Sequence, residues 1–145
     1  MSDACLVSAC LLGIRCRYDG KDALRPDLAS ALAGRTPVPV CPEQLGGLAT
    51  PRPAAQLRGG EGGDVLDGRA TVRTDAGADV TDAFRRGAEE VLKIAALHGA
   101  TEAFLKARSP SCGAGRVWRD GAVGDGDGVT AAALKRAGIR VTSVE

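Results

Sequence analysis

The amino-acid sequence predicts an α/β fold, with a mostly parallel sheet of about four strands, flanking helices in Rossmann-like layers and small hairpin insertions. Two observations carry this prediction. Short apolar runs alternate along the chain with segments of helical periodicity, and this alternation is typical of parallel strands joined by right-handed crossovers. The length of 145 residues suits one core that buries about two thirds of the unfolded surface, so residues 1–145 are expected to form a single domain.

Two expected strands, with a helix between them, come from the first part of the chain. The segments CLVSA (5–9) and TPVPV (36–40) are short apolar runs typical of buried parallel strands. Proline cannot donate to a sheet ladder, so the two prolines of the second run place it at a sheet edge or in an irregular strand. Residues 25–33 are expected to form a short helix, with Pro26 near its first turn and Gly34 as its stop.

The strongest helical pattern lies in the middle of the chain. From Asp79 or Thr81 to a stop at Gly99, apolar side chains recur at helical spacing: Phe84, Ala88, Val91, Leu92 and Ala95. The remaining elements complete the alternation: a strand at 102–107, a helix at 129–137 closed by Gly138, and a strand at 139–144.

Two insertions interrupt this order. Residues 46–78 contain GGEGG and an Asp67-Gly68 turn signal, which predict a loop and a small hairpin. A second Asp-Gly pair, at 120–121, follows RVWR and predicts another hairpin. The stretch GDGDG at 124–128 is expected to be a turn before the next helix, because the chain has no phosphate-binding glycine motif.

The charge balance limits the kind of partner. Lysine and arginine number 19 against 18 aspartate and glutamate, so the chain lacks the basic field that drives binding to nucleic acid or acidic membranes. A small-molecule partner is expected, with no nucleic acid and no membrane. No apolar stretch reaches the roughly 18 residues that span a bilayer, and Asp3 stands where a signal peptide has basic residues. We therefore expect a cytoplasmic protein, whose oligomeric state the sequence leaves open.

The chain has five cysteines, an odd number that argues against a framework of disulfides. Cys10, Cys41 and Cys112 each follow an expected strand. Because open α/β folds bind ligands at the carboxyl ends of parallel strands, these three thiols are expected to converge there. Thiolate chemistry or metal ligation is their expected use. Cys5 lies within a strand and is expected to be a small buried apolar residue.

Proton-handling groups accompany these cysteines. Glu43 follows Cys41 in CPE. Ser109 and Ser111 precede Cys112 in SPSCG. A carboxylate and two hydroxyl groups in one site can move protons or orient a water molecule. Taken singly, each also has a simpler explanation, as a capping carboxylate or as a turn former next to proline.

Other chemistries lack their motifs. No pair of cysteines has the C-x-x-C spacing of thioredoxin-like proteins or of structural zinc sites, and no arginine follows Cys10 at the spacing of a phosphatase loop. His98, the one histidine, lies near a helix end, where its charge would favour the helix dipole. An iron–sulfur cluster accepts thiolates from distant segments and usually takes four of them. Three are expected to converge here, and Cys16 is an uncertain fourth.

Five stretches of the chain, in order and over nearly its whole length, resemble the thiouracil desulfidase family: CLLGIRCRYDG (10–20), PVCPEQLGGLATPRP (39–53), GADVTDAFRRGA (77–88), FLKARSPSCG (104–113) and GDGVTAAALKRAGIRV (126–141). The loop after PRP departs from the family pattern, with AAQL where an acidic residue is expected near Gln56. Family membership fixes the scaffold more firmly than the substrate.

The resemblance implies an enzyme that removes sulfur from a thiolated nucleobase such as 2-thiouracil, without net redox change, giving the oxo base and sulfide. It implies a 4Fe-4S cluster held by only three cysteines, Cys10, Cys41 and Cys112, with one iron open to the small thiolated substrate. Glu43 would be the catalytic carboxylate and Ser109 the catalytic serine. Residues flanking these motifs are candidates to surround the ligands and the substrate: Arg15, Cys16, Arg17, Tyr18, Lys106 and Ser111.

The alternative is a protein of another class, a non-catalytic metal-binding or iron–sulfur carrier protein that uses the same thiolates for storage or transfer. Glu43 and Ser109 discriminate between the two, because a carrier has no use for a proton-handling pair beside its metal.

Overall fold

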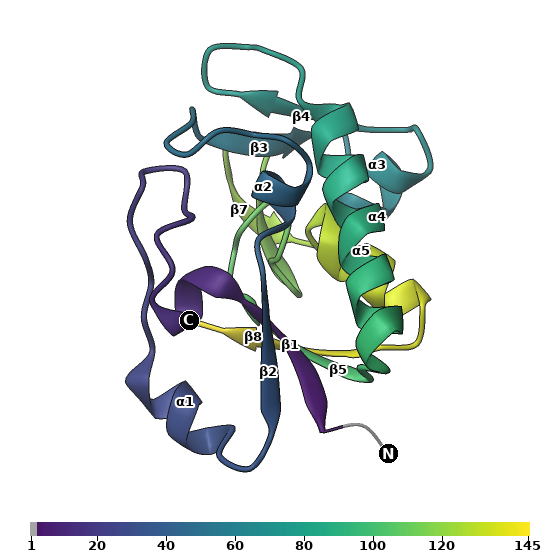
Figure 1. Ribbon diagram of the computed structural model, residues 1–145. Coiled ribbons are helices and arrows are strands. Elements are labelled where there is room, and N and C mark those ends of the chain that lie inside the picture. Colours follow the sequence, from purple (N-terminus) through teal and green to yellow (C-terminus); the bar gives the residue numbers. More distant parts are fainter. Residues whose placement is uncertain (1–2) are drawn as a thin grey trace.

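The parallel strands of the chain form one four-stranded sheet, in the order β2-β1-β5-β8 (Figure 1). The computed structural model describes residues 3–145. The strands are β1 (Ala4–Ser8), β2 (Thr36–Val40), β5 (Glu102–Lys106) and β8 (Arg140–Val144), and every pairing between them is parallel. The proline-containing strand β2 lies at one edge, as expected. The predicted α/β fold is confirmed, and the predicted strand ends are correct to within one residue.

Four helical elements cover the two faces of this sheet: η1 (Ala9–Leu12, a 3-10 turn), α1 (Pro26–Ala31), α4 (Thr81–His98) and α5 (Val129–Arg136). On β1, Leu6 faces α4 and α5, whereas Cys5 and Val7 face η1 and α1. Successive side chains of one buried strand thus contribute to two separate cores, as the pleat of a strand dictates.

The predicted helices form, with small differences at their ends. α4 ends at Gly99, which adopts a left-handed conformation with φ of 62°. Of its predicted apolar face, Phe84, Ala88, Val91 and Ala95 are buried, whereas Leu92 is half-buried. α1 is shorter than the predicted 25–33, and α5 ends one residue before the predicted 137. None of the helices formed by residues 3–145 has the length and apolarity that a bilayer crossing needs.

Four further strands form a second sheet, in the order β4-β3-β6-β7: β3 (Ala55–Arg58), β4 (Thr71–Thr74), β6 (Arg116–Arg119) and β7 (Ala122–Asp125). Two separate hairpins are expected from the sequence, whereas the structure joins them through one parallel pair, Leu57 with Arg119. The turn at Asp120 and Gly121 is confirmed, with φ values of 48° and 90°.

The first hairpin, β3 with β4, also forms, but Asp67-Gly68 is not its turn. The short helix α3 (Gly62–Leu66) lies between the two strands, and Asp67 caps its end. This helix forms because Val65, fully buried, packs into the core shared by the second sheet and α4. An Asp-Gly pair therefore marks a chain reversal here, at a helix end instead of a tight hairpin.

The strand order creates a crevice at one edge of the parallel sheet. The chain passes from β1 to β2 on one side and later continues from β5 to β8 on the other, so the connections that follow β1 and β5 leave in opposite directions at a switch point. The main-chain pairing of β1 with β5 ends at Val7 and Phe104. Beyond it, the Lys106 N–H donates to Ser8 Oγ at 2.9 Å and holds the strand ends together. The second sheet lies across this edge of the first (Figure 1).

Candidate functional site

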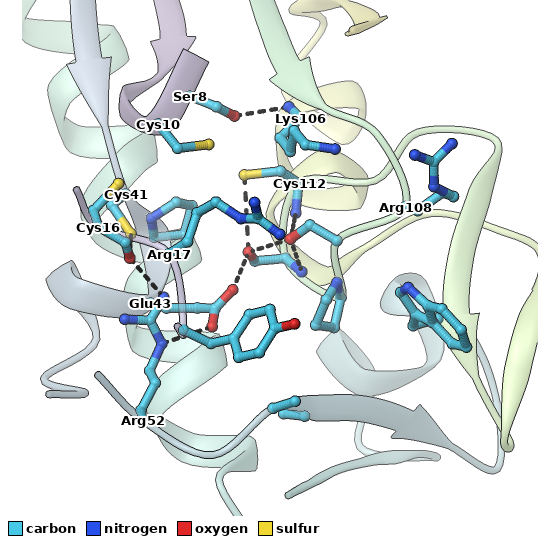
Figure 2. A pocket seen from close by; sticks show the side chains of 18 of the residues that line it. Ser8, Cys10, Cys16, Arg17, Cys41, Glu43, Arg52, Lys106, Arg108 and Cys112 are labelled. Carbon is cyan, nitrogen blue, oxygen red and sulfur yellow. Dashed lines mark hydrogen bonds and ion pairs between the residues drawn. The ribbon is translucent and has the colours of Figure 1, made fainter. Parts of the chain in front are cut away.

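A cavity of about 450 Å³ opens at the carboxyl ends of β1, β2 and β5 (Figure 2). This volume falls in the range of about 300–1,000 Å³ that is typical of small-ligand sites. Cysteine side chains line the cavity on the side of the parallel sheet, and residues of the second sheet line the opposite wall, among them Gln56 and Trp118. The cavity therefore lies at the switch point, where open α/β folds bind ligands.

Four cysteines line this cavity: Cys10, Cys16, Cys41 and Cys112. The three strand-end thiols come from three elements: η1 after β1, the start of α2 (Pro42–Leu45) after β2, and the SPSCG turn after β5. In Figure 2 the sulfur atoms of Cys10 and Cys112 point toward one another. Cys5 is fully buried within β1, as expected. The structure thus brings the three strand-end cysteines together at one edge of the sheet and adds Cys16 beside them.

Helix α2 packs directly on α4, and two glycines make this contact possible. A methyl group at Gly46 would lie 2.0 Å from the carbonyl oxygen of Ala83. One at Gly87 would lie 2.0 Å from the carbonyl oxygen of Pro42. Side chains cannot fit at such distances, so these positions require glycine. The glycine pair therefore fixes the helix that carries Glu43.

The SPSCG turn is held by one of its own hydroxyl groups and by α5. Ser109 Oγ accepts the backbone N–H groups of Ser111 and Cys112, at 3.2 and 3.1 Å. The carbonyl oxygens of Pro110 and Ser111 accept N–H groups from the first turn of α5. This double anchoring satisfies donors at the start of the helix and holds the Cys112 backbone in one position.

A largely buried ion pair orients Glu43. Arg52 Nε donates to Glu43 Oε1 at 3.0 Å, and only 6% of the Arg52 side chain is exposed. The same guanidinium donates to the carbonyl oxygens of Ala49 and Cys16 and to Thr50 Oγ1. With these partners the buried charge is paired and hydrogen-bonded, as a buried arginine must be. Arg52 thus ties the carboxylate to the loop that carries Cys16.

The other oxygen of Glu43 begins a chain of hydroxyl groups. Ser111 Oγ donates to Glu43 Oε2 at 3.0 Å, and Ser109 Oγ lies 3.0 Å from Ser111 Oγ. Ser111 is buried, whereas Ser109 is half-buried. The structure therefore brings the two predicted catalytic residues, Glu43 and Ser109, into one network, with Ser111 between them.

Burial and hydrogen bonding shift the acidity of three thiols in different directions. Burial raises the pKa of the Cys112 thiol to about 12. A hydrogen bond with Cys16, together with burial, raises the pKa of the Cys41 thiol. The pKa of Cys10 is lowered, because Cys16 is its hydrogen-bond partner as well. Cysteine binds metals as the thiolate, so the positive charge of a bound metal would have to offset the burial of these groups.

The arrangement of the thiols fits a cluster better than a single metal ion. Within residues 3–145, no three His, Cys, Asp or Glu side chains lie close enough together to bind one ion. Thiolates around one zinc lie only about 3.8 Å apart, because each Zn–S bond is about 2.3 Å long. An iron–sulfur cluster is also bound by cysteine thiolates but places several atoms between them. Cys10, Cys41 and Cys112 line one cavity of about 450 Å³ from three different strand ends, and such a set of thiols is compatible with the second geometry.

Most of the residues predicted to surround the ligands and the substrate also line the cavity: Cys16, Arg17, Tyr18, Lys106 and Ser111. Arg15 does not line it. Its neighbour Cys16 takes the inward position, so the Arg15 side chain is exposed. The Arg17 guanidinium lies 5.8 Å from the centre of the Tyr18 ring, within the range of a cation–π contact. Burial lowers the pKa of Lys106, whose ammonium group is beside the thiols.

Sequence patterns missed two side chains of the cavity. Arg52 lies within the TPRP stretch, but no pattern in the sequence predicts that it pairs with Glu43. Trp118 lies in the RVWR stretch that predicts a hairpin strand. The sequence does contain a signal for the direction of the Trp118 side chain. Its neighbour Val117 is apolar and suits a core, and because side chains alternate between the faces of a strand, Trp118 must then point away from that core.

These features define a class of protein. The chain is an α/β protein whose parallel sheet carries, at its switch point, an open thiol-lined cavity with a carboxylate and two hydroxyl groups. A family model described as 2-thiouracil desulfurase matches residues 5–145, and the chain belongs to this family. The family resemblance predicted from the sequence motifs is confirmed.

Two known proteins are similar to this chain over nearly their whole length. The uncharacterized protein YbbK of Bacillus subtilis (strain 168) is 45% identical over 141 residues, which cover 95% of this chain and 93% of YbbK. A solved structure described as the 4Fe-4S-dependent thiouracil desulfidase TudS is 42% identical, with a TM-score of 0.81. The match to TudS covers 97% of this chain and 89% of that one, so the two proteins share the fold as a whole.

Proposed function

We propose that this protein is a desulfidase that depends on a 4Fe-4S cluster. Its substrate is a thiolated nucleobase such as 2-thiouracil, which water converts to the oxo base and hydrogen sulfide with no net redox change. One observation carries the proposal: the thiol-lined cavity also holds Glu43 in a hydrogen-bonded chain with two serines. The similar solved structure, described as a 4Fe-4S-dependent thiouracil desulfidase, supports the same reaction class.

Cys10, Cys41 and Cys112 are the proposed ligands, because they follow three different strands and line one cavity. With only three protein ligands, a bound cluster would supply one iron open to an external sulfur atom, as a Lewis acid. Cys16 is proposed to lie behind the ligands, as a hydrogen-bond partner of Cys10 and Cys41. Lys106 lines the same cavity, where its positive charge would partly offset that of the thiolates.

Glu43 is the proposed general base. Replacing sulfur by oxygen at the ring carbon requires water to form a C–O bond there and to lose a proton as the bond forms. A carboxylate that faces the cavity can accept this proton, a kind of assistance typically worth about 10² to 10⁴ in rate. As the C–S bond breaks, both protons of the water end on sulfur, which leaves as hydrogen sulfide. Glu43 therefore ends the cycle as it began, ready for another water.

The two serines are proposed to connect Glu43 with the substrate. A hydroxyl group donates and accepts at once, so Ser109 and Ser111 can pass a proton along the chain that ends at Glu43 Oε2. Ser109 is the less buried of the two and is the proposed outer member. Arg52 occupies Oε1 of the carboxylate, which leaves Oε2 for the proton.

The test is a comparison of cluster content and sulfide release on the same anaerobic samples. Reconstituted wild type is expected to bind iron and sulfide and to release hydrogen sulfide from 2-thiouracil. Glu43→Gln is expected to keep the full cluster and to lose turnover by a factor of about 10² or more, because the amide keeps the shape but cannot accept the proton. Glu89→Gln, on the exposed face of α4, is the matched control and is expected to behave as wild type.

Two outcomes would contradict the proposal. Wild-type rates in Glu43→Gln with a full cluster would remove the carboxylate from the mechanism. A cluster-loaded wild type that releases no sulfide from any thiolated base would favour the alternative, an iron–sulfur carrier protein.

A further inference from the structure

Trp118 stands on the wall of the cavity that faces the thiols. It belongs to β6, where its neighbour Val117 is fully buried in the core of the second sheet. Because side chains alternate along a strand, Trp118 points away from that core, and it lines the cavity together with Gln56 of the adjacent strand. It remains 47% exposed, which is unusual for the largest apolar side chain of a chain with so few aromatic residues.

Hydrogen bonds to two other segments hold the backbone of the hairpin that carries Trp118. The backbone N–H of Trp118 donates to the carbonyl oxygen of Arg108 at 3.0 Å, directly before the SPSCG turn. At the hairpin tip, the Asp120 N–H donates to the carbonyl oxygen of Leu57 at 2.9 Å. The Gly121 N–H donates to the side-chain oxygen of Gln56. These bonds hold the Trp118 backbone at a set place relative to the proposed catalytic turn.

The distribution of aromatic residues points to a ligand with a planar ring. The chain has one Trp, one Tyr and two Phe, and the two that are exposed, Tyr18 and Trp118, both line this cavity. The Tyr18 ring already carries the Arg17 guanidinium on one face. An exposed indole gains most from contact with another flat π-system, and stacking of a nucleobase on an aromatic side chain is typically worth about 1–3 kcal/mol.

We propose that Trp118 stacks on the ring of the substrate and makes the cavity selective for heteroaromatic thiocarbonyl compounds over open-chain ones. This inference rests on the proposed function, because it assumes that the cavity binds a thiolated base. It assigns to the second sheet the recognition of the ring, and leaves the chemistry of the C–S bond to the edge of the parallel sheet.

Binding of uracil, the oxo product, to anaerobic cluster-loaded protein tests the inference by equilibrium dialysis. Trp118→Ala is expected to weaken uracil binding by about tenfold or more, within the range of measured stacking energies. Trp118→Phe keeps a ring and is expected to retain most of the affinity. Leu97→Ala, which truncates an 83% exposed apolar side chain on α4, is the matched control and is expected to bind as wild type. Iron content of every sample confirms that the variants are folded and loaded.

Selectivity is read from sulfide release with 2-thiouracil and with thiourea, which has the same thiocarbonyl group but no ring. Trp118→Ala is expected to raise KM for 2-thiouracil more than it lowers kcat, and to leave thiourea nearly unaffected. Uracil affinity within twofold of wild type in Trp118→Ala would overturn the inference, while sulfide release by the same sample would leave the proposed function intact. Conversely, uracil binding that depends on Trp118, without any sulfide release by wild type, would support stacking and overturn the proposed function.

Discussion

The contact between α2 and α4 predicts an unusual effect for Gly87→Ala. In the interior of an exposed helix, Gly→Ala normally stabilises by about 0.5–1 kcal/mol, because glycine loses more backbone entropy on folding. At Gly87 the added methyl group would lie 2.0 Å from the carbonyl oxygen of Pro42 and 2.8 Å from its carbon. Real contacts of this kind essentially never fall below 3.0 Å, so α2 must move away from α4 by about 1 Å.

The magnitude follows from two opposing effects. Overpacking of a close contact costs about 1–3 kcal/mol, which outweighs the gain in helix propensity. We expect a net loss of stability of about 1–2 kcal/mol. The effect on activity should be larger, because Pro42 lies between Cys41 and Glu43, and a displacement of about 1 Å can cost about 10² in rate. Iron content is expected to fall as well, since Cys41 is a proposed ligand.

Urea denaturation, iron per chain and sulfide release from 2-thiouracil together measure these effects. Gly63→Ala in α3 is the matched control, because the methyl group there would meet only the flexible end of Arg136, at 3.1 Å. This control is expected to keep full iron content and activity, with unchanged or higher stability. A Gly87→Ala protein with a higher urea midpoint, full iron content and wild-type turnover would refute the reasoning.

The remaining predictions concern the ligands and the buried arginine. Replacing any one of the three proposed cysteine ligands by serine is expected to abolish stable cluster binding, because each supplies one of only three protein bonds, whereas Cys5→Ser should keep the cluster. Iron analysis of anaerobic samples checks this; loss of the cluster in Cys16→Ser together with its retention in Cys41→Ser would contradict the assignment. Arg52→Gln is expected to destabilise the fold by at most about 3–5 kcal/mol, the cost of breaking a fully buried pair, because Glu43 loses its charged partner but keeps the hydrogen bond from Ser111, and to lower turnover at equal iron content. Arg52→Lys should be intermediate, since lysine keeps the charge but lacks the planar fork that reaches several acceptors, and a urea midpoint equal to wild type in Arg52→Gln would show that the ion pair does not stabilise the protein.

Local patterns in the sequence were sufficient for the parallel sheet, for α4 and for the position of the cysteines along it. A strand buried on both faces must be apolar throughout, and a helix packed on one side must repeat its apolar residues at helical spacing. Burial of these elements therefore produces a recognisable hydrophobic pattern in the sequence. Cys10 and Cys41 follow such runs closely. The topology of a parallel sheet then requires strand ends to meet at one edge, which is why their convergence with Cys112 could be expected.

Only the tertiary structure decided how the cavity is completed around those thiols. The second sheet depends on a single parallel pair between two hairpins that are far apart in the sequence, and no hydrophobic periodicity predicts this pairing. The pairing of Glu43 with Arg52, and the insertion of Ser111 between Glu43 and Ser109, depend on how α2 and the SPSCG turn pack on their neighbours. Contacts of this kind join segments far apart in the chain through side-chain shape and close backbone approach, which the spacing of residue types along a sequence does not encode.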